Sequence, residues 1–200
     1  TLDTALRSNL LSKQTSDMGL VDAARNSLDK LTLTQLSYNI LTNSIPPGYL
    51  NLNNAVPSDP SVNLQIHNVP TIYTIENSGR MLGEIIPNIM LLINRNDWVI
   101  QKNIAKKINK KTLPNFIAEI KHLYLSAYSA QWAQVLNSIT VTSAESMQQT
   151  QNRISQLTQS YSKLWGILNI ILHNTHSSDK SSDFYNIITS SFLTLDSINP

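Results

Sequence analysis

Two histidines and an aspartate near the end of the chain have the spacing that comes nearest to a metal site. His173 and His176 lie three residues apart on an expected helix, and Asp179 follows one turn later. Two imidazoles and a carboxylate placed in this way could converge on Zn²⁺. The segment lacks the glutamate base of a zinc hydrolase, and histidines at a helix end also complement its negative dipole terminus. We expect no metal and no cofactor, with a metal-dependent hydrolase as an alternative.

Motifs for nucleophilic catalysis and phosphate binding are missing from the sequence. No Gly-x-Ser-x-Gly turn occurs, so no serine can be assigned as a nucleophile. Gly79 and Gly83 lie on an apolar helix without a following Gly-Lys-Ser/Thr, which favours close helix packing over a phosphate cradle. The absence of cysteine excludes thiolate chemistry and disulfides. The sequence therefore predicts a protein that is not an enzyme.

Five lysines form the one charge feature that could bind a partner. Lys102, Lys106 and Lys110 recur every four residues, and Lys107 and Lys111 lie beside them. On one continuous helix these cations would share a face that could meet anionic lipid headgroups or phosphates. A solvated helix face is the simpler interpretation, and nucleic-acid stacking would need interleaved aromatic residues.

Large aromatic residues recur along the second half of the chain. They could form a ligand box or an interface belt, because such side chains dominate binding hot spots. Their helical spacing and aliphatic neighbours favour core packing instead. These residues are Trp98, Trp132, Trp165, Tyr124, Tyr128 and Tyr161.

Helices must position nearly all of these residues, because apolar residues recur at intervals of three and four. Thr32 is expected to cap one helix that Pro46 and Pro47 stop. Pro87 is expected to kink the segment over residues 75–93, which is either one helix or a helix pair. Residues 46–70 predict a long ordered loop in which 62–66 could form one short strand. The expected helices span residues 2–14, 17–31, 32–41, 75–93, 97–108, 116–139, 143–157, 161–172 and 183–195.

The composition agrees with a mainly α protein. The chain of 200 residues is 41% hydrophobic with only 5 glycines, which favours packed helices over strands and turns. The net charge of +2 is too small to indicate a nucleic-acid partner. The longest apolar run falls short of the roughly 20 residues that span a bilayer. We predict a multi-helix bundle with a long Pro/Asn-rich loop and at most a minor β element.

The chain begins without a methionine or a signal-peptide pattern, so we expect residues 1–200 to be a fragment of a longer protein. Two sub-units are conceivable within it, residues 1–70 with N-terminal helices and the loop, and residues 71–200 with a helical bundle.

Three blocks of residues, taken in order, resemble the periplasmic region of the IcmF family, called TssM in type VI secretion. The first contains Ala24, Arg25, Leu28, Leu33, Leu36 and Tyr38, with Ser37 where the family often has a basic residue. The second contains Val69, Pro70, Thr71, Ile72, Tyr73 and Thr74, and then Asp97, Trp98, Val99 and Ile100. The third contains Tyr124, Tyr128, Trp132 and Leu136, followed by Leu157, Leu164, Leu168 and Thr175.

The resemblance implies a non-catalytic assembly component of a bacterial secretion system. It implies the periplasmic segment of an inner-membrane protein that stabilises an envelope-spanning complex and works with a small DotU-like membrane protein, bound mainly through regions outside this chain. The Ser/Asn-rich surface leans toward the type IVB Dot/Icm branch, which is linked to virulence, rather than type VI. The motif residues Tyr38, Pro70, Thr74, Asp97, Trp98, Tyr124, Tyr128 and Trp132 are expected to be structural. A membrane-surface module that uses the face from Lys102 to Lys111 is the alternative function.

Overall fold

The computed structural model describes residues 32–95 and 108–196 of the chain. The helices expected over residues 2–14 and 17–31 lie outside this part, as does the helix expected over 97–108 apart from its last residue.

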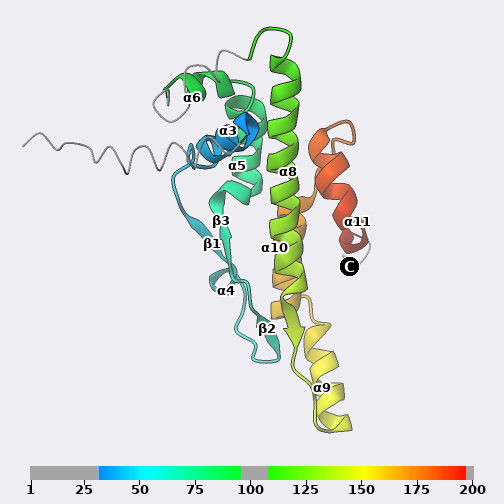
Figure 1. Cartoon of the computed structure of the whole chain (residues 1–200). Helices are drawn as coiled ribbons and strands as arrows, with labels where there is room; N and C mark the ends of the chain where they lie inside the picture. The colour runs from blue at the N-terminus through cyan, green and yellow to red at the C-terminus, as the bar shows by residue number, and fades with distance from the viewer. Residues whose placement is uncertain (1–31, 96–107, 197–200) are drawn as a thin grey trace, which may run out of the picture.

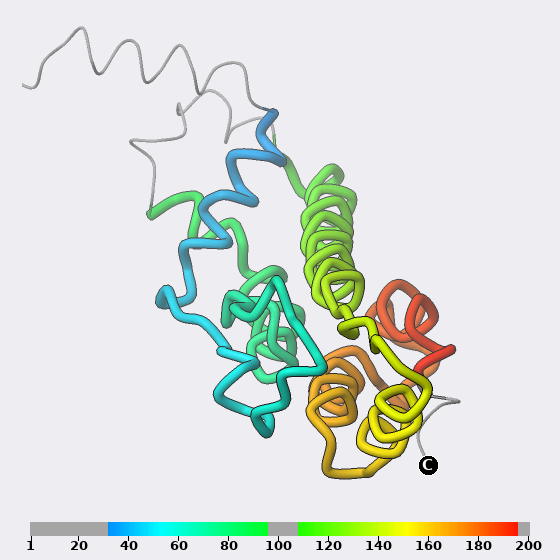
Figure 2. The backbone as a smooth tube through the Cα atoms, turned by 90° about the horizontal axis from the view of Figure 1, so that it is seen from below, coloured from blue at the N-terminus to red at the C-terminus, as the bar shows by residue number. Residues whose placement is uncertain are grey.

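The long helix α8 (Leu113–Asn137) is the axis around which the other elements pack (Figure 1). Helices α3 (Leu33–Thr42) and α6 (Ile89–Arg95) lie near one end of α8, and α10 (Lys163–Thr175) and α11 (Ser190–Asp196) lie along its other half. Figure 2 shows residues 32–95 on one side of α8 and α10, with α11 on the opposite side. A single buried apolar cluster runs through all of these elements.

Helix α3 begins and ends where the sequence predicts. Thr32 is its N-cap and forms a capping box with Gln35, in which the threonine hydroxyl accepts from the Gln35 N–H at 3.2 Å and the Gln35 side chain accepts from the Thr32 N–H at 2.9 Å. The helix ends at Thr42, four residues before Pro46. The predicted start and stop signals are therefore confirmed.

Helix α8 owes its position to a repeat of apolar residues every four positions. Phe116, Ile120, Tyr124, Tyr128 and Trp132 are all buried on one side of it. The helix begins three residues earlier than predicted because a proline, Pro114, is tolerated in a first turn, where its missing N–H has no helical acceptor.

Residues 46–70 are more structured than the predicted loop. They contain β1 (Tyr49–Asn51), the single-turn helix α4 (Leu52–Ala55), β2 (Val62–Leu64) and β3 (Asn68–Pro70). Strands β1 and β3 pair antiparallel within this stretch, with Leu50 opposite Val69. The predicted strand near 62–66 is confirmed as β2.

The partner of β2 comes from the far end of α8. Strand β4 (Ile139–Val141) follows directly after that helix and pairs antiparallel with β2, with Asn63 opposite Thr140. The prediction that the helix extends to Ile139 is therefore wrong, because the chain there leaves α8 and enters a sheet.

The expected helix over residues 75–93 is divided into three pieces. Helix α5 (Ile75–Arg80) continues into a π-helical turn, η2 (Met81–Ile85), and α6 starts only at Ile89. The break coincides with Pro87, which has no N–H to donate. The predicted kink is confirmed, in the stronger form of an interruption.

The glycines of this segment do not serve close packing, contrary to the prediction. Gly79 and Gly83 are exposed, and a Cβ built on either would meet nothing within 4 Å. Gly166 in α10 is the close contact instead, because a Cβ there would lie 2.8 Å from Cγ1 of Val56.

The last elements are the helix α9 (Met147–Leu157), α10, the π-helical turn η3 (Tyr185–Thr189) and α11. The N-cap of α10 is Ser162, which accepts from the Trp165 N–H at 3.3 Å, whereas the helix predicted over residues 161–172 would have Ser160 as its cap. The mainly α class with a minor β element is confirmed by these elements and the two small sheets. Among residues 32–95 and 108–196, no helix combines the length and the hydropathy of a membrane span.

Candidate functional site

Most of the aromatic motif residues meet at the centre of the molecule. Tyr38 from α3, Tyr73 from the 3-10 turn η1 (Thr71–Tyr73), and Tyr124 and Tyr128 from α8 form a group that we call the tyrosine cluster. The rings of Tyr73 and Tyr124 stack with centroids 6.2 Å apart, and those of Tyr124 and Tyr128 meet edge to face at 6.1 Å. Asp97 and Trp98 lie outside the described residues.

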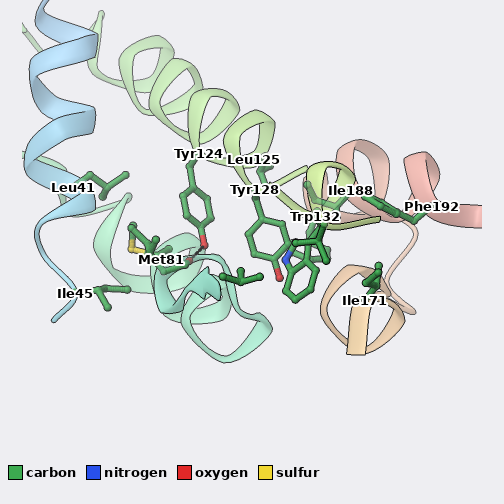
Figure 3. Close-up of a cluster of buried hydrophobic side chains, with 14 of the residues drawn as sticks. Leu41, Ile45, Met81, Tyr124, Leu125, Tyr128, Trp132, Ile171, Ile188 and Phe192 are labelled. Atoms are coloured by element: carbon green, nitrogen blue, oxygen red, sulfur yellow. Dashed lines mark hydrogen bonds between the residues drawn. The ribbon is translucent and has the colours of Figure 1, made fainter. Parts of the chain in front are cut away.

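Three side chains of α8, which are labelled in Figure 3, donate hydrogen bonds to main-chain carbonyls of neighbouring segments. The hydroxyl of Tyr124 donates to the carbonyl of Ile72 at 2.8 Å, and that of Tyr128 to the carbonyl of Asn174 at 2.6 Å. The indole N–H of Trp132 donates to the carbonyl of Tyr73 at 2.8 Å. Because the three residues recur every four positions, they lie in a row on one side of the helix and fasten both the η1 turn and the end of α10.

Asn174 is a structural residue that the sequence analysis missed. It is 3% exposed, its carboxamide oxygen accepts from the N–H of Ile75 at 2.9 Å, and its NH₂ group donates to the carbonyl of Ile170 at 2.8 Å. Asn174 therefore satisfies a free N–H at the start of α5, where Thr74 is the N-cap residue but makes no capping hydrogen bond through its side chain. The available signal was a single amide on an otherwise apolar helix face.

The two remaining motif residues of this region shape the chain between β3 and α5. Pro70 ends β3, opposite Tyr49 of β1. Thr74 is buried, and its hydroxyl donates to the carbonyl of Thr71 at 2.9 Å, which closes the η1 turn.

Three hydroxyls of the tyrosine cluster are held in their neutral form. Burial raises the pKa of Tyr38, Tyr124 and Tyr128 well above the ordinary value of 10.0. For Tyr38 the hydrogen bond with Tyr73, 3.2 Å between the two oxygens, adds to the effect. Neutral hydroxyls that donate to buried carbonyls stabilise packing and supply neither a nucleophile nor a base.

The two histidines and Asp179 do not converge on a common metal-binding position. His173 lies in the last turn of α10 with Nε2 at 3.6 Å from a carboxylate oxygen of Glu76 on α5, and both side chains are largely exposed. His176 follows as the C-cap of α10, and the carboxylate of Asp179 accepts hydrogen bonds from Ser181. Within residues 32–95 and 108–196, no three His, Asp or Glu side chains are grouped so that they could hold a metal ion.

Three of the five candidate lysines, Lys102, Lys106 and Lys107, lie outside the described residues. Lys110 and Lys111 are exposed and lie in a turn before α8. The side chain of Asn109 accepts from the N–H of Lys111 at 2.9 Å and so stabilises this turn. The prediction that all five lysines share one helix face is therefore wrong for Lys110 and Lys111.

The prediction of core packing holds for some aromatic residues only. Trp132, Tyr124 and Tyr128 are fully buried, whereas Trp165 is partly exposed and Tyr161 is 72% exposed. Because α10 is capped at Ser162, Tyr161 precedes the helix and projects from the turn that joins α9 to α10.

An open surface cleft of about 610 Å³ contains this tyrosine. Its walls are the loop 57–61, Thr142 after β4, the second half of α9 with the residues that follow it, and the start of α10. We call it the Tyr161 cleft. It is lined by hydroxyls, two glutamines and three charged side chains, Asp59, Arg153 and Lys163.

The chain matches the model of a known protein family. The model of the IcmF-related family, described as intracellular multiplication and human macrophage-killing, matches residues 1–176. Neither the curated proteins nor the solved structures give a match. The match covers most of the chain and includes the tyrosine cluster and its hydrogen bonds. The chain therefore belongs to the IcmF-related family, which indicates a component of a bacterial secretion system.

Proposed function

We propose that this chain is the periplasmic, non-catalytic part of an inner-membrane secretion protein, and that it stabilises the envelope-spanning complex through contacts with other subunits. The observation that supports the proposal is that the family-motif residues form structural hydrogen bonds. Tyr124, Tyr128 and Trp132 direct their polar atoms at buried main-chain carbonyls, so the motif maintains a rigid body rather than a reaction site.

The surface of that body fits a role in protein contacts. The chain is only 14% charged, and its exposed residues are largely Ser, Thr, Asn and Gln. Interfaces between subunits deplete charge at their centre and retain polar hydrogen-bonding groups at their rim. Because this surface carries little charge, its burial against a partner subunit would cost little desolvation free energy.

The family supports a proposal about the partners. We propose that the partners are other subunits of the same secretion system, with a DotU-like membrane protein bound mainly through regions beyond residues 1–200. The Dot/Icm branch remains our preferred setting over type VI secretion.

A membrane-surface role is the second candidate, and the exposure of Lys110 and Lys111 favours it. Flotation of the full chain with anionic vesicles tests this role. Binding that disappears when the five lysines from Lys102 to Lys111 are changed to glutamate would support it, and binding that is insensitive to those changes would dismiss it.

The assembly role is tested by crosslinking in cells. The membrane-embedded parent protein is compared with and without residues 1–200, and the captured envelope proteins are identified by mass spectrometry. We expect the deletion to remove other secretion-system subunits from the captured set. Equal membrane amounts of both forms serve as the control, and an unchanged set of subunits would refute the proposal.

A further inference from the structure

The walls of the Tyr161 cleft are fixed by hydrogen bonds before any ligand arrives. The carboxylate of Asp59 accepts from the N–H and the hydroxyl of Ser61 at 2.8 and 2.6 Å. The carbonyl of Ser61 in turn accepts from the N–H and hydroxyl of Thr142 at 2.9 and 3.2 Å. The guanidinium of Arg153 donates to the Thr142 carbonyl. These bonds connect the loop, the end of the β2–β4 sheet and α9, so a ligand would meet a preorganised surface.

The cleft has more hydrogen-bond donors than acceptors among its charged groups. Its one carboxylate, Asp59, is already engaged with Ser61, and these hydrogen bonds, with smaller contributions from Lys163 and Arg153, hold its pKa below the ordinary value. Arg153 carries five N–H donors and Lys163 three, and the described bonds of Arg153 account for one. The lining therefore suits a ligand that brings acceptor oxygens and a single negative charge.

Two side chains of the cleft, Lys163 and Tyr161, are suited to contact a ligand. Lys163 is the first residue of α10, where the positive end of the helix dipole disfavours a cation. Tyr161 leaves a large aromatic ring 72% exposed at the rim of the cleft. Tyrosine and arginine are enriched among the residues that carry most of the energy of protein interfaces.

We propose that the Tyr161 cleft binds a short acidic peptide segment of another subunit, with a carboxylate against Lys163 and Arg153 and an apolar side chain on Tyr161. This inference rests on the proposed assembly function and names one of its contact sites. The volume of about 610 Å³ is enough for a few side chains rather than a folded domain.

The lining favours a peptide over a phosphate-rich ligand. Two cations offset by one carboxylate leave a single positive charge, which is too little for a polyphosphate or an anionic membrane surface. Gln156 and Gln159 each present a carboxamide with donor and acceptor, which matches the amide groups of a peptide main chain.

The test uses the full chain and an array of synthetic peptides, about 12 residues each, that tile the other subunits of the same secretion system. A second array carries the same peptides with every Asp and Glu changed to Asn and Gln and with amidated C-termini. We expect capture on the first array and loss on the second. Captured peptides are then titrated in solution by fluorescence anisotropy.

Matched variants connect binding to the cleft. Lys163→Gln and Tyr161→Ala should each weaken a captured peptide by about tenfold or more. As controls, Lys180→Gln removes an exposed lysine outside the cleft, and Tyr49→Ala removes a tyrosine that is 69% exposed, close to the 72% of Tyr161; both should leave the affinity unchanged. Arg153 is left intact because its guanidinium also holds the Thr142 carbonyl. Circular dichroism confirms that each variant is folded.

Each result decides the inference. The inference is overturned if the chain binds equally to both arrays. It is also overturned if the wild-type chain and both cleft variants bind a captured peptide with the same affinity. Binding of inorganic phosphate or of phosphatidylglycerol vesicles that depends on Lys163, without peptide capture, overturns it in favour of a phosphate ligand. If deletion of residues 1–200 leaves the crosslinked subunits unchanged, the proposed assembly function is refuted. If the deletion removes subunits but no acidic peptide is captured, the assembly function stands and only the proposal about the Tyr161 cleft is refuted.

Discussion

The Tyr128→Phe substitution isolates one of the hydrogen bonds that fasten α10 to α8. It removes the hydroxyl that donates to the Asn174 carbonyl at 2.6 Å and leaves the ring in place. The side chain is fully buried, so water cannot replace the lost donor. A buried carbonyl left without its partner costs about 1–3 kcal/mol, and we expect the free energy of unfolding to fall by that amount.

Urea unfolding followed by tryptophan fluorescence and circular dichroism measures this change, with an unchanged m value as the sign that only stability has altered. The matched control is Tyr161→Phe, because that ring is 72% exposed and should cost less than about 0.5 kcal/mol. Tyr124→Phe removes the bond to the Ile72 carbonyl and should behave like Tyr128→Phe. A Tyr128→Phe protein as stable as the Tyr161→Phe control would refute the view that these hydroxyls hold the body together.

Three further substitutions test other features. Gly79→Ala should raise the free energy of unfolding by about 0.5–1 kcal/mol in urea titrations, because the glycine lies exposed inside a helix with room for a methyl group, and a loss would contradict this. Gly166→Ala should lower it by about 1–3 kcal/mol in the same assay, since the new Cβ would lie 2.8 Å from Val56, and a gain would show that Val56 moves aside. Asp59→Asn should flatten the decrease of stability in acid: hydrogen bonds from Ser61 lower the folded pKa of Asp59, so its contribution is present above the ordinary pKa of 3.8 and is lost as pH falls below it. Thermal unfolding measured across that pH range tests this prediction, and an Asp59→Asn protein that loses stability in acid as much as the wild type would contradict it.

Local signals predicted the elements that they govern directly. The cap residue Thr32 predicted the start of α3, and the repeat through Tyr124, Tyr128 and Trp132 predicted the buried side of α8. Both signals act within one or two turns of helix, so they can be detected without knowledge of what the helix packs against.

The sheets and the contacts of α10 were beyond the sequence because they depend on distant segments. The strand near residues 62–66 was predicted without a partner, because β2 pairs with β4 only where α8 ends. Strands β1, β3 and β4 have three residues each, too few for an alternation of side chains to be recognised. The role of Asn174 likewise depends on α5, whose N–H it accepts.

The candidate site depended on the position of one helix cap. Ser160 and Ser162 are equivalent as caps in local chemistry, and the choice between them decides whether Tyr161 enters α10 or precedes it. With Ser162 as the cap, the tyrosine lies at the rim of the cleft. Sequence periodicity had assigned the same residue to the core.

The pairing of Val62 with Val141 also sets an order of folding. Helix α8 can form from neighbouring residues, whereas β2 and β4 meet only after the intervening chain has closed into a loop, and such distant contacts are entropically costly and form late. In hydrogen-exchange labelling during refolding, we therefore expect the amide protons in the middle of α8 to become protected before those of β2. Since the Tyr161 cleft takes one wall from the end of this sheet, a partially folded chain would lack the cleft, and subunit recognition there would report that folding is complete.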